Sequence, residues 1–310
     1  MLRVLFPCLC LGVAVEAGAI KPDREYIRYP YHSGLIYEPL EVVTVDGYKI
    51  ETWFYPAQEV SDSVQSSDRP LPFTTLDDTP RPTLIICNAD AANMSYYQVV
   101  LAACYAANGY NVVTFDWRGF GASDPFDMDT DYLCYTEMLL DYDAVIESVA
   151  RCPYVDADNI FLFGWSTGAY LSMIAAQRND VRGCILRGCI TSFDDAIPVI
   201  KQDKGEYDRN LIVPADFPLK ALPLSAAPDF QRDVMLIVGE NDTRTPPWMS
   251  QQIYDALPND IYKELWIVPG AKHSAKDAPE FMALPQFLSR TISFMETSAG
   301  RSDTLSEKSK

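Results

Sequence analysis

The stretch that most constrains this chain is Asn159–Leu171, read NIFLFGWSTGAYL. Its apolar and aromatic run, Ile160–Phe163, predicts a buried strand, and an apolar pattern of helical period follows the turn. The turn has the form Gly-x-Ser-x-Gly, with Ser166 at its centre. Glycines suit these positions because a side chain two residues from a serine on so sharp a turn would collide with it. We interpret Ser166 as a nucleophile held between a strand and a helix.

From residue 83 onward, strand-like and helical patterns alternate, which predicts an α/β fold: a mostly parallel central sheet with helices on both faces. Besides the strand and helix around Ser166, the expected strands are Thr83–Cys87, Asn111–Trp117, Gly183–Ile190, Asp233–Val238 and Glu264–Val268, and the expected helices are Met94–Asn108, Tyr132–Arg151 and Glu280–Met295. Nearer the start, Leu40–Val45 and Tyr48–Tyr55 alternate around Asp46-Gly47, which predicts an antiparallel hairpin.

The domain organisation follows from length and local composition. The 310 residues, 48% hydrophobic, are enough for one large core, which we place at residues 35–296. An N-terminal extension at 20–34 precedes it, and we expect residues 24–34, rich in Tyr and Arg, to pack on the edge of the domain. Residues 57–81 lack periodicity and predict a mobile surface loop. Residues 194–230 contain five prolines that break any long helix, and we expect a short cap over the site, with an irregular connection as the alternative. The polar residues 297–310 predict a disordered tail.

Residues 1–19 have the pattern of a secretory signal peptide. Arg3 is followed by an apolar run too short to span a bilayer, and small residues precede Ile20. We expect export to the periplasm or the extracellular space, and a mature chain without a stable membrane span. The alternative is a buried or frayed N-terminal segment.

Charge and cysteine content exclude several classes of function. The formal net charge of −18 argues against a nucleic acid or an anionic membrane as partner. The sequence contains neither a phosphate-binding or dinucleotide fingerprint nor a Cys/His cluster, so we expect no cofactor and no metal. Six cysteines follow residue 19, and their spacing does not resemble a disulfide framework, so we expect no disulfide.

A serine hydroxyl becomes a good nucleophile when an adjacent base accepts its proton. The sequence offers two histidines. We assign this role to His273 because it follows the last strand, and parallel strands bring their carboxyl ends to the edge where Ser166 lies. His32 lies in the N-terminal extension and is expected to be a surface or packing residue. Asp242, after the strand Asp233–Val238, is the expected carboxylate partner, with Glu240, Asp194 and Asp195 as alternatives.

Several ordered motifs extend beyond this constellation: NADAANM at 88–94, FDWRGFGASD at 115–124, GWSTG at 164–168, ITSFDDA at 190–196, GENDTRTPP at 239–247 and VPGAKH at 268–273. With them, residues 35–296 resemble the α/β-hydrolases, and within these the Bem46-like and serine-aminopeptidase-type groups. The resemblance implies the α/β-hydrolase fold and a catalytic triad formed by Ser166, Asp242 and His273.

The same resemblance implies an oxyanion hole formed by the backbone amides of Thr167 and Asp90, with Ala91 as the alternative to Asp90. The chain departs from the family here. Such hydrolases usually have His-Gly followed by a small loop such as Asn-Ala-Gly-Asn where this chain has Asn88–Asn93. Alanine methyl groups restrict the loop, and a carboxylate beside a developing oxyanion opposes it, so we expect low activity.

These patterns predict a serine hydrolase that cleaves carboxylic esters or thioesters, with a small-molecule or lipid-like acyl substrate. Two alternatives stay open: a serine-aminopeptidase-type amide hydrolase, and an exported protein that keeps the fold but binds a ligand without catalysis. Four aromatic residues either line an acyl pocket or pack in the core: Tyr96, Tyr97, Phe120 and Trp165. The sequence does not predict the oligomeric state.

Overall fold

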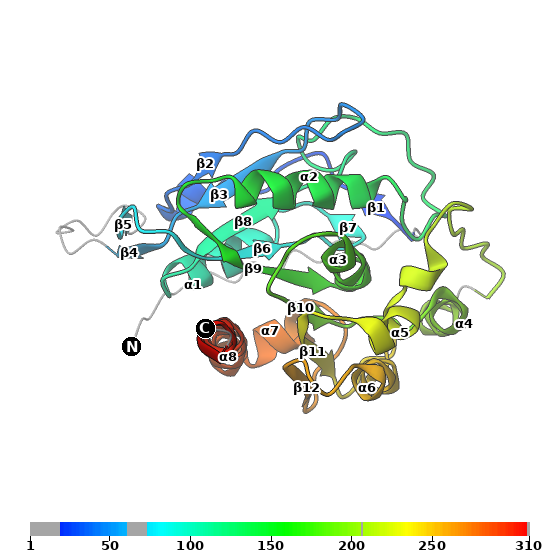
Figure 1. Cartoon of the computed structure of the whole chain (residues 1–310). Coiled ribbons are helices and arrows are strands. Elements are labelled where there is room, and N and C mark those ends of the chain that lie inside the picture. The colour runs from blue at the N-terminus through cyan, green and yellow to red at the C-terminus, as the bar shows by residue number, and fades with distance from the viewer. Residues whose placement is uncertain (1–18, 61–72, 206, 309–310) are drawn as a thin grey trace.

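A central eight-stranded sheet forms the body of the protein (Figure 1). The computed structural model describes residues 19–60, 73–205 and 207–308. The strands lie in the order β12–β11–β10–β9–β6–β8–β3–β2; those from β12 to β8 are parallel, and β3 and β2 extend the edge in antiparallel fashion. Their bounds are β2 Glu38–Pro39, β3 Thr52–Tyr55, β6 Arg81–Ile86, β8 Asn111–Phe115, β9 Val155–Trp165, β10 Gly183–Arg187, β11 Asp233–Gly239 and β12 Lys263–Val268. The predicted fold class is confirmed.

Helices cover both faces of this sheet because side chains alternate along each buried strand. On β6, Leu84 and Ile86 pack with residues of α1 and α8, whereas Ile85 belongs to the cluster formed with α2, α3 and α6. The helices are α1 Gln98–Ala106, α2 Met138–Ala150, α3 Thr167–Arg178, α4 Phe193–Lys204, α5 Pro223–Ala226, α6 Pro247–Ala256, α7 Pro279–Met282 and α8 Leu284–Lys308. Single 3-10 turns occur at Pro30–Ser33, Leu219–Ala221, Ala227–Asp229 and Ala275–Asp277.

The predicted N-terminal hairpin is confirmed. Val43 bridges Lys49 in antiparallel fashion around the turn at Gly47, whose φ of +89° suits glycine. Two predicted helices begin later than expected, at Gln98 instead of Met94 and at Met138 instead of Tyr132. In the first case residues 94–97 form turns, and the backbone N–H of Met94 binds the Asp116 carboxylate.

Two expectations about irregular segments are corrected. The loop expected at 57–81 contains an antiparallel pair, β4 Gln58–Val60 and β5 Phe73–Thr75. Gln58 is anchored to the backbone of Ile36, and Val60 and the residues of β5 are good strand formers. Residues 61–72 lie outside the described residues. The tail expected to be disordered from 297 continues helix α8 to Lys308, with Ser298 bonded to Asp233. In the segment 194–230, where a short cap over the site was expected, helix α4 runs through Pro198 and is capped at its start by Ser192.

A second small parallel pair joins β1 Lys21–Pro22 to β7 Ala91–Ala92. The signal peptide predicted at residues 1–19 lies outside the described residues except for Ala19, which is buried. Across the residues that the structure describes, no helix is both long and apolar enough for a transmembrane segment. Over the same residues, no group of three or more potential metal ligands converges, and the six cysteines carry free thiols.

Candidate active site

Three parallel strands, β9, β11 and β12, deliver the predicted site residues to one edge of the sheet. Strand β9 ends at Trp165, directly before Ser166. Strand β11 ends at Gly239 and leads to Asp242, and β12 ends at Val268 and leads to His273. Since all three strands run in the same direction, their carboxyl ends lie together.

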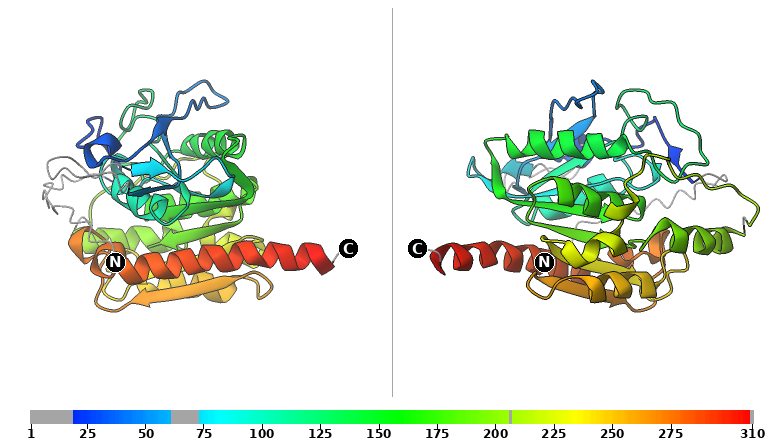
Figure 2. Two further views of the ribbon diagram at one scale, coloured as in Figure 1. Left: turned by 90° about the vertical axis from the view of Figure 1, so that its left-hand side faces the viewer. Right: turned by 45° about the vertical axis from the view of Figure 1, so that its right-hand side comes forward.

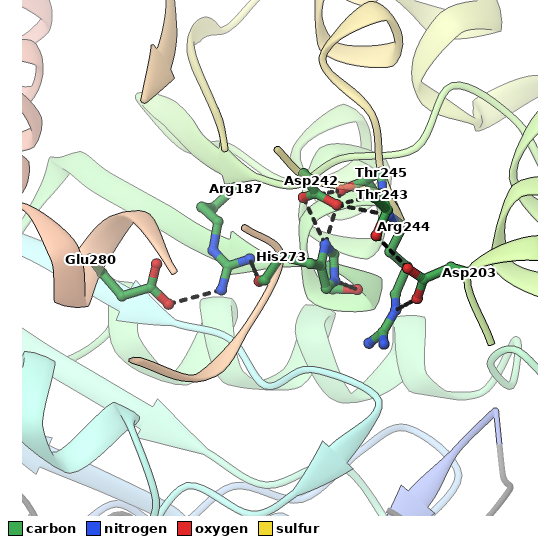
Figure 3. A network of polar contacts seen from close by, with 9 residues as sticks. Arg187, Asp203, Asp242, Thr243, Arg244, Thr245, His273 and Glu280 are labelled. Carbon is green, nitrogen blue, oxygen red and sulfur yellow. Dashed lines mark hydrogen bonds and ion pairs between the residues drawn. The ribbon is translucent and has the colours of Figure 1, made fainter. Parts of the chain in front are cut away.

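The structure brings Ser166, His273 and Asp242 into one hydrogen-bonded chain. His273 Nε2 lies 3.1 Å from Ser166 Oγ, and His273 Nδ1 lies 2.8 Å from Asp242 Oδ2. A carboxylate only accepts hydrogen bonds, so Nδ1 carries the ring proton and Nε2 is free to accept the proton of the serine. Figure 3 shows His273 directed toward Asp242 and Thr245.

The Asp242 carboxylate is held in its ionised form. Burial alone would raise the pKa of this carboxyl, but His273 and the hydrogen bonds from Thr245 outweigh burial and place its pKa below the usual value. Thr245 donates to Asp242 twice, from its backbone N–H and from its hydroxyl, each at 2.8 Å. Arg244 donates a third hydrogen bond from its backbone N–H at 2.9 Å.

The three alternative carboxylates do not contact the histidine. Glu240 accepts a hydrogen bond from the backbone N–H of Gly270, and Asp195 accepts one from Thr191. Asp194 lies exposed in the first turn of α4. His32 lies exposed in the N-terminal extension, where its Nδ1 accepts the backbone N–H of Tyr29. Of the histidines, only His273 contacts Ser166 among the described residues.

The turn at Ser166 has the strained backbone that the motif predicts. Its φ of +54° and ψ of −116° fall outside the usual regions for a non-glycine residue. A Cβ on Gly164 would lie 2.3 Å from the carbonyl oxygen of Gly168, and a Cβ on Gly168 would lie 1.9 Å from that of Asn88. Both flanking glycines are therefore required by close backbone approach.

The loop expected to complete the oxyanion hole lies beside Ser166. Asp90 and Thr167 line the same cavity as the serine. The carbonyl of Asp90 accepts a hydrogen bond from the backbone N–H of Lys21 at 2.6 Å, so the N–H of Ala91, which shares that trans peptide plane, points the opposite way. Ala92 has a φ of +67°, a conformation that glycine adopts without strain. The methyl group in place of glycine therefore strains this loop.

The cavity beside Ser166 is small and mostly apolar. It holds about 30 Å³, room for two or three water molecules. Its apolar walls come from the segment before α2, from α3, from the loop after β10 and from α4: Leu133, Tyr170, Ile190, Phe193, Ala196 and Ile200. None of the four aromatic residues considered as pocket residues lines it. Phe120 is buried in the core, and Tyr97 packs against Trp165.

Sequence reasoning missed several residues of this site. Phe193, Ala196, Ile200 and Lys204 all face the cavity from α4, and their spacing of three or four residues is the signal that could have identified them. It also missed the buried guanidinium of Arg187, which donates to the carbonyl oxygen of His273 and, at 2.8 Å, to Glu280 Oε1 (Figure 3). An arginine ending an apolar strand was the only hint of this contact.

Comparisons with known proteins agree with this architecture. The model of the prolyl oligopeptidase family matches residues 95–299. The chain is 24% identical to the protein Bem46 of Schizosaccharomyces pombe over 57% of its length, and the match spans 52% of that protein. It is 20% identical to the α/β-hydrolase domain-containing protein WAV2 of Arabidopsis thaliana, over 80% of this chain and 79% of the relative.

Among solved structures, the esterase Pf2001 of Pyrococcus furiosus superposes with a TM-score of 0.66. The alignment covers 89% of this chain and 99% of the esterase, at 18% sequence identity. At this identity the superposition establishes the fold. The α/β-hydrolase fold inferred from the ordered motifs is therefore confirmed.

Proposed function

This chain belongs to the prolyl oligopeptidase family of α/β-hydrolases, and from that premise we propose that it is a serine hydrolase that cleaves carboxylic esters or thioesters through an acyl-enzyme on Ser166. One observation carries the proposal: the strained serine, the histidine and the ionised aspartate form an unbroken hydrogen-bonded chain beside a cavity. This arrangement provides a nucleophile, a base in contact with it and a group that orients the base.

The reaction proceeds in two halves. Ser166 Oγ attacks the acyl carbonyl carbon while its proton moves to His273 Nε2, and the imidazolium then donates that proton to the leaving group. Water attacks the acyl-enzyme in the second half, with His273 again accepting and returning a proton. Throughout, Asp242 keeps the proton on Nδ1 and stabilises the imidazolium.

The tetrahedral oxyanion is stabilised by the backbone amides of Thr167 and Asp90. Thr167 is the first residue of α3, so its N–H needs no partner within the helix. The strained Ala92 and the Asp90 carboxylate support the expectation of modest activity, since loss of one such donor costs about 10²–10³ in rate.

The small apolar cavity favours a short acyl group. A volume of about 30 Å³ accommodates only a few carbon atoms without movement of the walls. We therefore expect acetyl to butyryl esters to be preferred over long-chain esters.

Amide hydrolysis is a second candidate, and the family match to prolyl oligopeptidases favours it. The same triad performs both reactions, but an amide requires protonation of a poorer leaving group by His273. A p-nitroanilide series measured beside the ester series distinguishes the two.

The test is hydrolysis of p-nitrophenyl esters from acetate to palmitate by the wild-type chain and by Ser166→Ala. We expect turnover that peaks at short chains and falls to background in the variant. Ser225→Ala, which changes an exposed serine of α5, is the matched control and keeps full activity.

A fluorophosphonate probe should label Ser166 in the wild type and not in the variant. Absence of both turnover and labelling would overturn the proposal and leave a non-catalytic binding protein as the better account.

A further inference from the structure

Two basic side chains line the cavity that holds Ser166. Lys204 reaches it from the last turn of α4, and Arg244 reaches it from the loop after β11. The cavity is otherwise mostly apolar, with Asp90 as the acidic residue on its wall. Two basic residues beside one acidic residue are a notable lining in a chain whose formal charge is −18.

The Asp203 carboxylate fixes the position of the Arg244 side chain. Its Nε donates to Asp203 Oδ2 at 3.2 Å, and the Asp203 side chain, 16% exposed, also accepts a hydrogen bond from the Thr243 hydroxyl. Figure 3 shows the guanidinium turned so that Nε meets Asp203 while its outer nitrogens point away from that carboxylate. Within the described residues, neither of those two nitrogens donates a hydrogen bond.

A guanidinium held at Nε presents its two outer nitrogens as a pair of parallel donors. This pair matches the two oxygens of a carboxylate, and Lys204 supplies a second positive charge on the same cavity. Lys204 also has an ordinary structural role, because basic residues in the last turn of a helix interact favourably with its dipole. Lys201 occupies the same last turn without lining the cavity, so the two roles can be separated by experiment.

We propose that this hydrolase acts on esters whose short acyl chain ends in a carboxylate, that is, on half-esters of short dicarboxylic acids. The carboxylate binds the outer nitrogens of Arg244 and the ammonium of Lys204, and the ester carbonyl lies at Ser166. The short chain between the two groups occupies the apolar part of the cavity. This inference rests on the proposed serine hydrolase function and names its substrate class.

The test compares two esters that differ only at the distal end of the acyl chain: monomethyl glutarate and methyl valerate. Methanol release is measured for both with the wild-type chain. We expect kcat/KM to favour the carboxylate by about 10-fold or more, because a hydrogen bond to a charged group contributes about 1.5–3 kcal/mol. Monomethyl succinate and monomethyl adipate then define the preferred chain length.

Four variants assign the preference to residues. Lys204→Gln and Arg244→Gln should each reduce kcat/KM for the carboxylate about 10-fold more than for the neutral ester, mainly through KM. Lys201→Gln removes the same charge from the same helical turn and should leave both esters unaffected. Arg244→Lys keeps the charge without the paired donors and should recover only part of the preference.

Equal rates for the two esters in the wild type, or a preference for methyl valerate, would overturn the inference while leaving the ester hydrolase intact. Parallel losses for both esters in Lys204→Gln would also overturn it, since they indicate a structural role. Calorimetric binding of monomethyl glutarate to Ser166→Ala separates the two proposals. If Ser166→Ala binds monomethyl glutarate and the double variant Ser166→Ala/Lys204→Gln does not, the anion site is supported even if the wild type hydrolyses no ester.

Discussion

Asp116 is a fully buried carboxyl that joins three segments behind the active site. Its Oδ1 accepts the backbone N–H of Met94 at 2.7 Å, and its Oδ2 accepts the hydroxyl of Tyr26 at 2.8 Å. Burial raises the pKa of this carboxyl to about 7, against the opposing effect of these hydrogen bonds. The loop carrying Asp90 is therefore anchored to a group that titrates near neutral pH.

Stability should fall as the pH rises through the window between about 4, the pKa of an unfolded aspartate, and about 7, because the folded state binds a proton there that the unfolded state has released. Asp116→Asn keeps an acceptor for Met94 and cannot titrate. Urea unfolding at pH 5 and at pH 8 measures the free energy of unfolding of both proteins. Between these two pH values the wild type should lose stability relative to the variant, by up to about 1.4 kcal/mol per pH unit inside the window. Parallel pH profiles for the two proteins would contradict the assignment.

At this scale the triad was predictable because its chemistry is local. The glycines around Ser166 identify the turn, and only His273 of the two histidines follows a strand of the sheet. The ion pair between Arg187 and Glu280 was not predictable, since it joins residues 93 positions apart and nothing near either one identifies its partner. The sequence allowed several carboxylates as the partner of His273 for the same reason, and the hydrogen bond to His273 identifies Asp242 as that partner.

Helix α4 forms one wall of the active-site cavity and is the element that sets its size. Phe193, Ala196 and Ile200 face the cavity, whereas Val199 packs against the core beside it. Phe193 is also fixed by edge-on contacts with Tyr170 and Phe217. Ile200 is only partly buried, so truncating its side chain should destabilise the fold less than truncating Phe193.

Ile200→Ala should shift the preferred acyl chain to longer esters by about two methylenes, because it removes three carbon atoms from the cavity wall. The p-nitrophenyl ester series measures this shift as a change in the chain length of maximal kcat/KM. Val199→Ala, one residue away and outside the cavity, is the matched control and should leave the profile in place. An unchanged profile in Ile200→Ala would mean that the acyl chain lies elsewhere.

The parallel strands of the central sheet were predictable because each contains a buried apolar run, as β8, β9 and β11 do. The segments around α4 were not, because prolines normally mark helix ends, and yet α4 contains Pro198. The end of the chain was mispredicted for a related reason. Its polar composition suggested disorder, but the polar side chains of Ser298 and Arg301 bond to Asp233 and Asp260 and continue α8 along the body.

At the scale of the whole molecule, the N-terminal segment at 19–34 belongs to the active-site architecture. Its strand β1 pairs with β7, and Ala19 lines the cavity itself. Ile20 is fully buried, and the hydroxyl of Tyr96 binds Asp23 at 2.7 Å. Residues 24–34 were predicted to pack on the edge of the domain, and Tyr26 and Tyr29 do contact Trp53 of β3 beside that edge. Residues 21 and 22 also pair with the loop beside Ser166, which was not predicted.

Deleting residues 1–34 should therefore reduce esterase activity at least about 10-fold and lower the melting temperature, since the Asp90 loop loses both its strand partner and the Tyr26 contact to Asp116. Deleting residues 302–310 at the far end of α8 is the control, and both properties should stay at the wild-type level. Ester turnover and thermal unfolding check this. If the protein without residues 1–34 kept its activity, the Asp90 loop would hold its position without the N-terminal segment.

The position of Ala19 also has a practical consequence for anyone who produces this protein. A purification tag fused directly before Ile20 would begin beside the catalytic cavity and would therefore compete with substrate for access to it. The opposite terminus is the safer point of attachment, because α8 runs outward and its tip stands clear of the body (Figure 2). Samples tagged at the two ends should therefore not be treated as equivalent in activity screens.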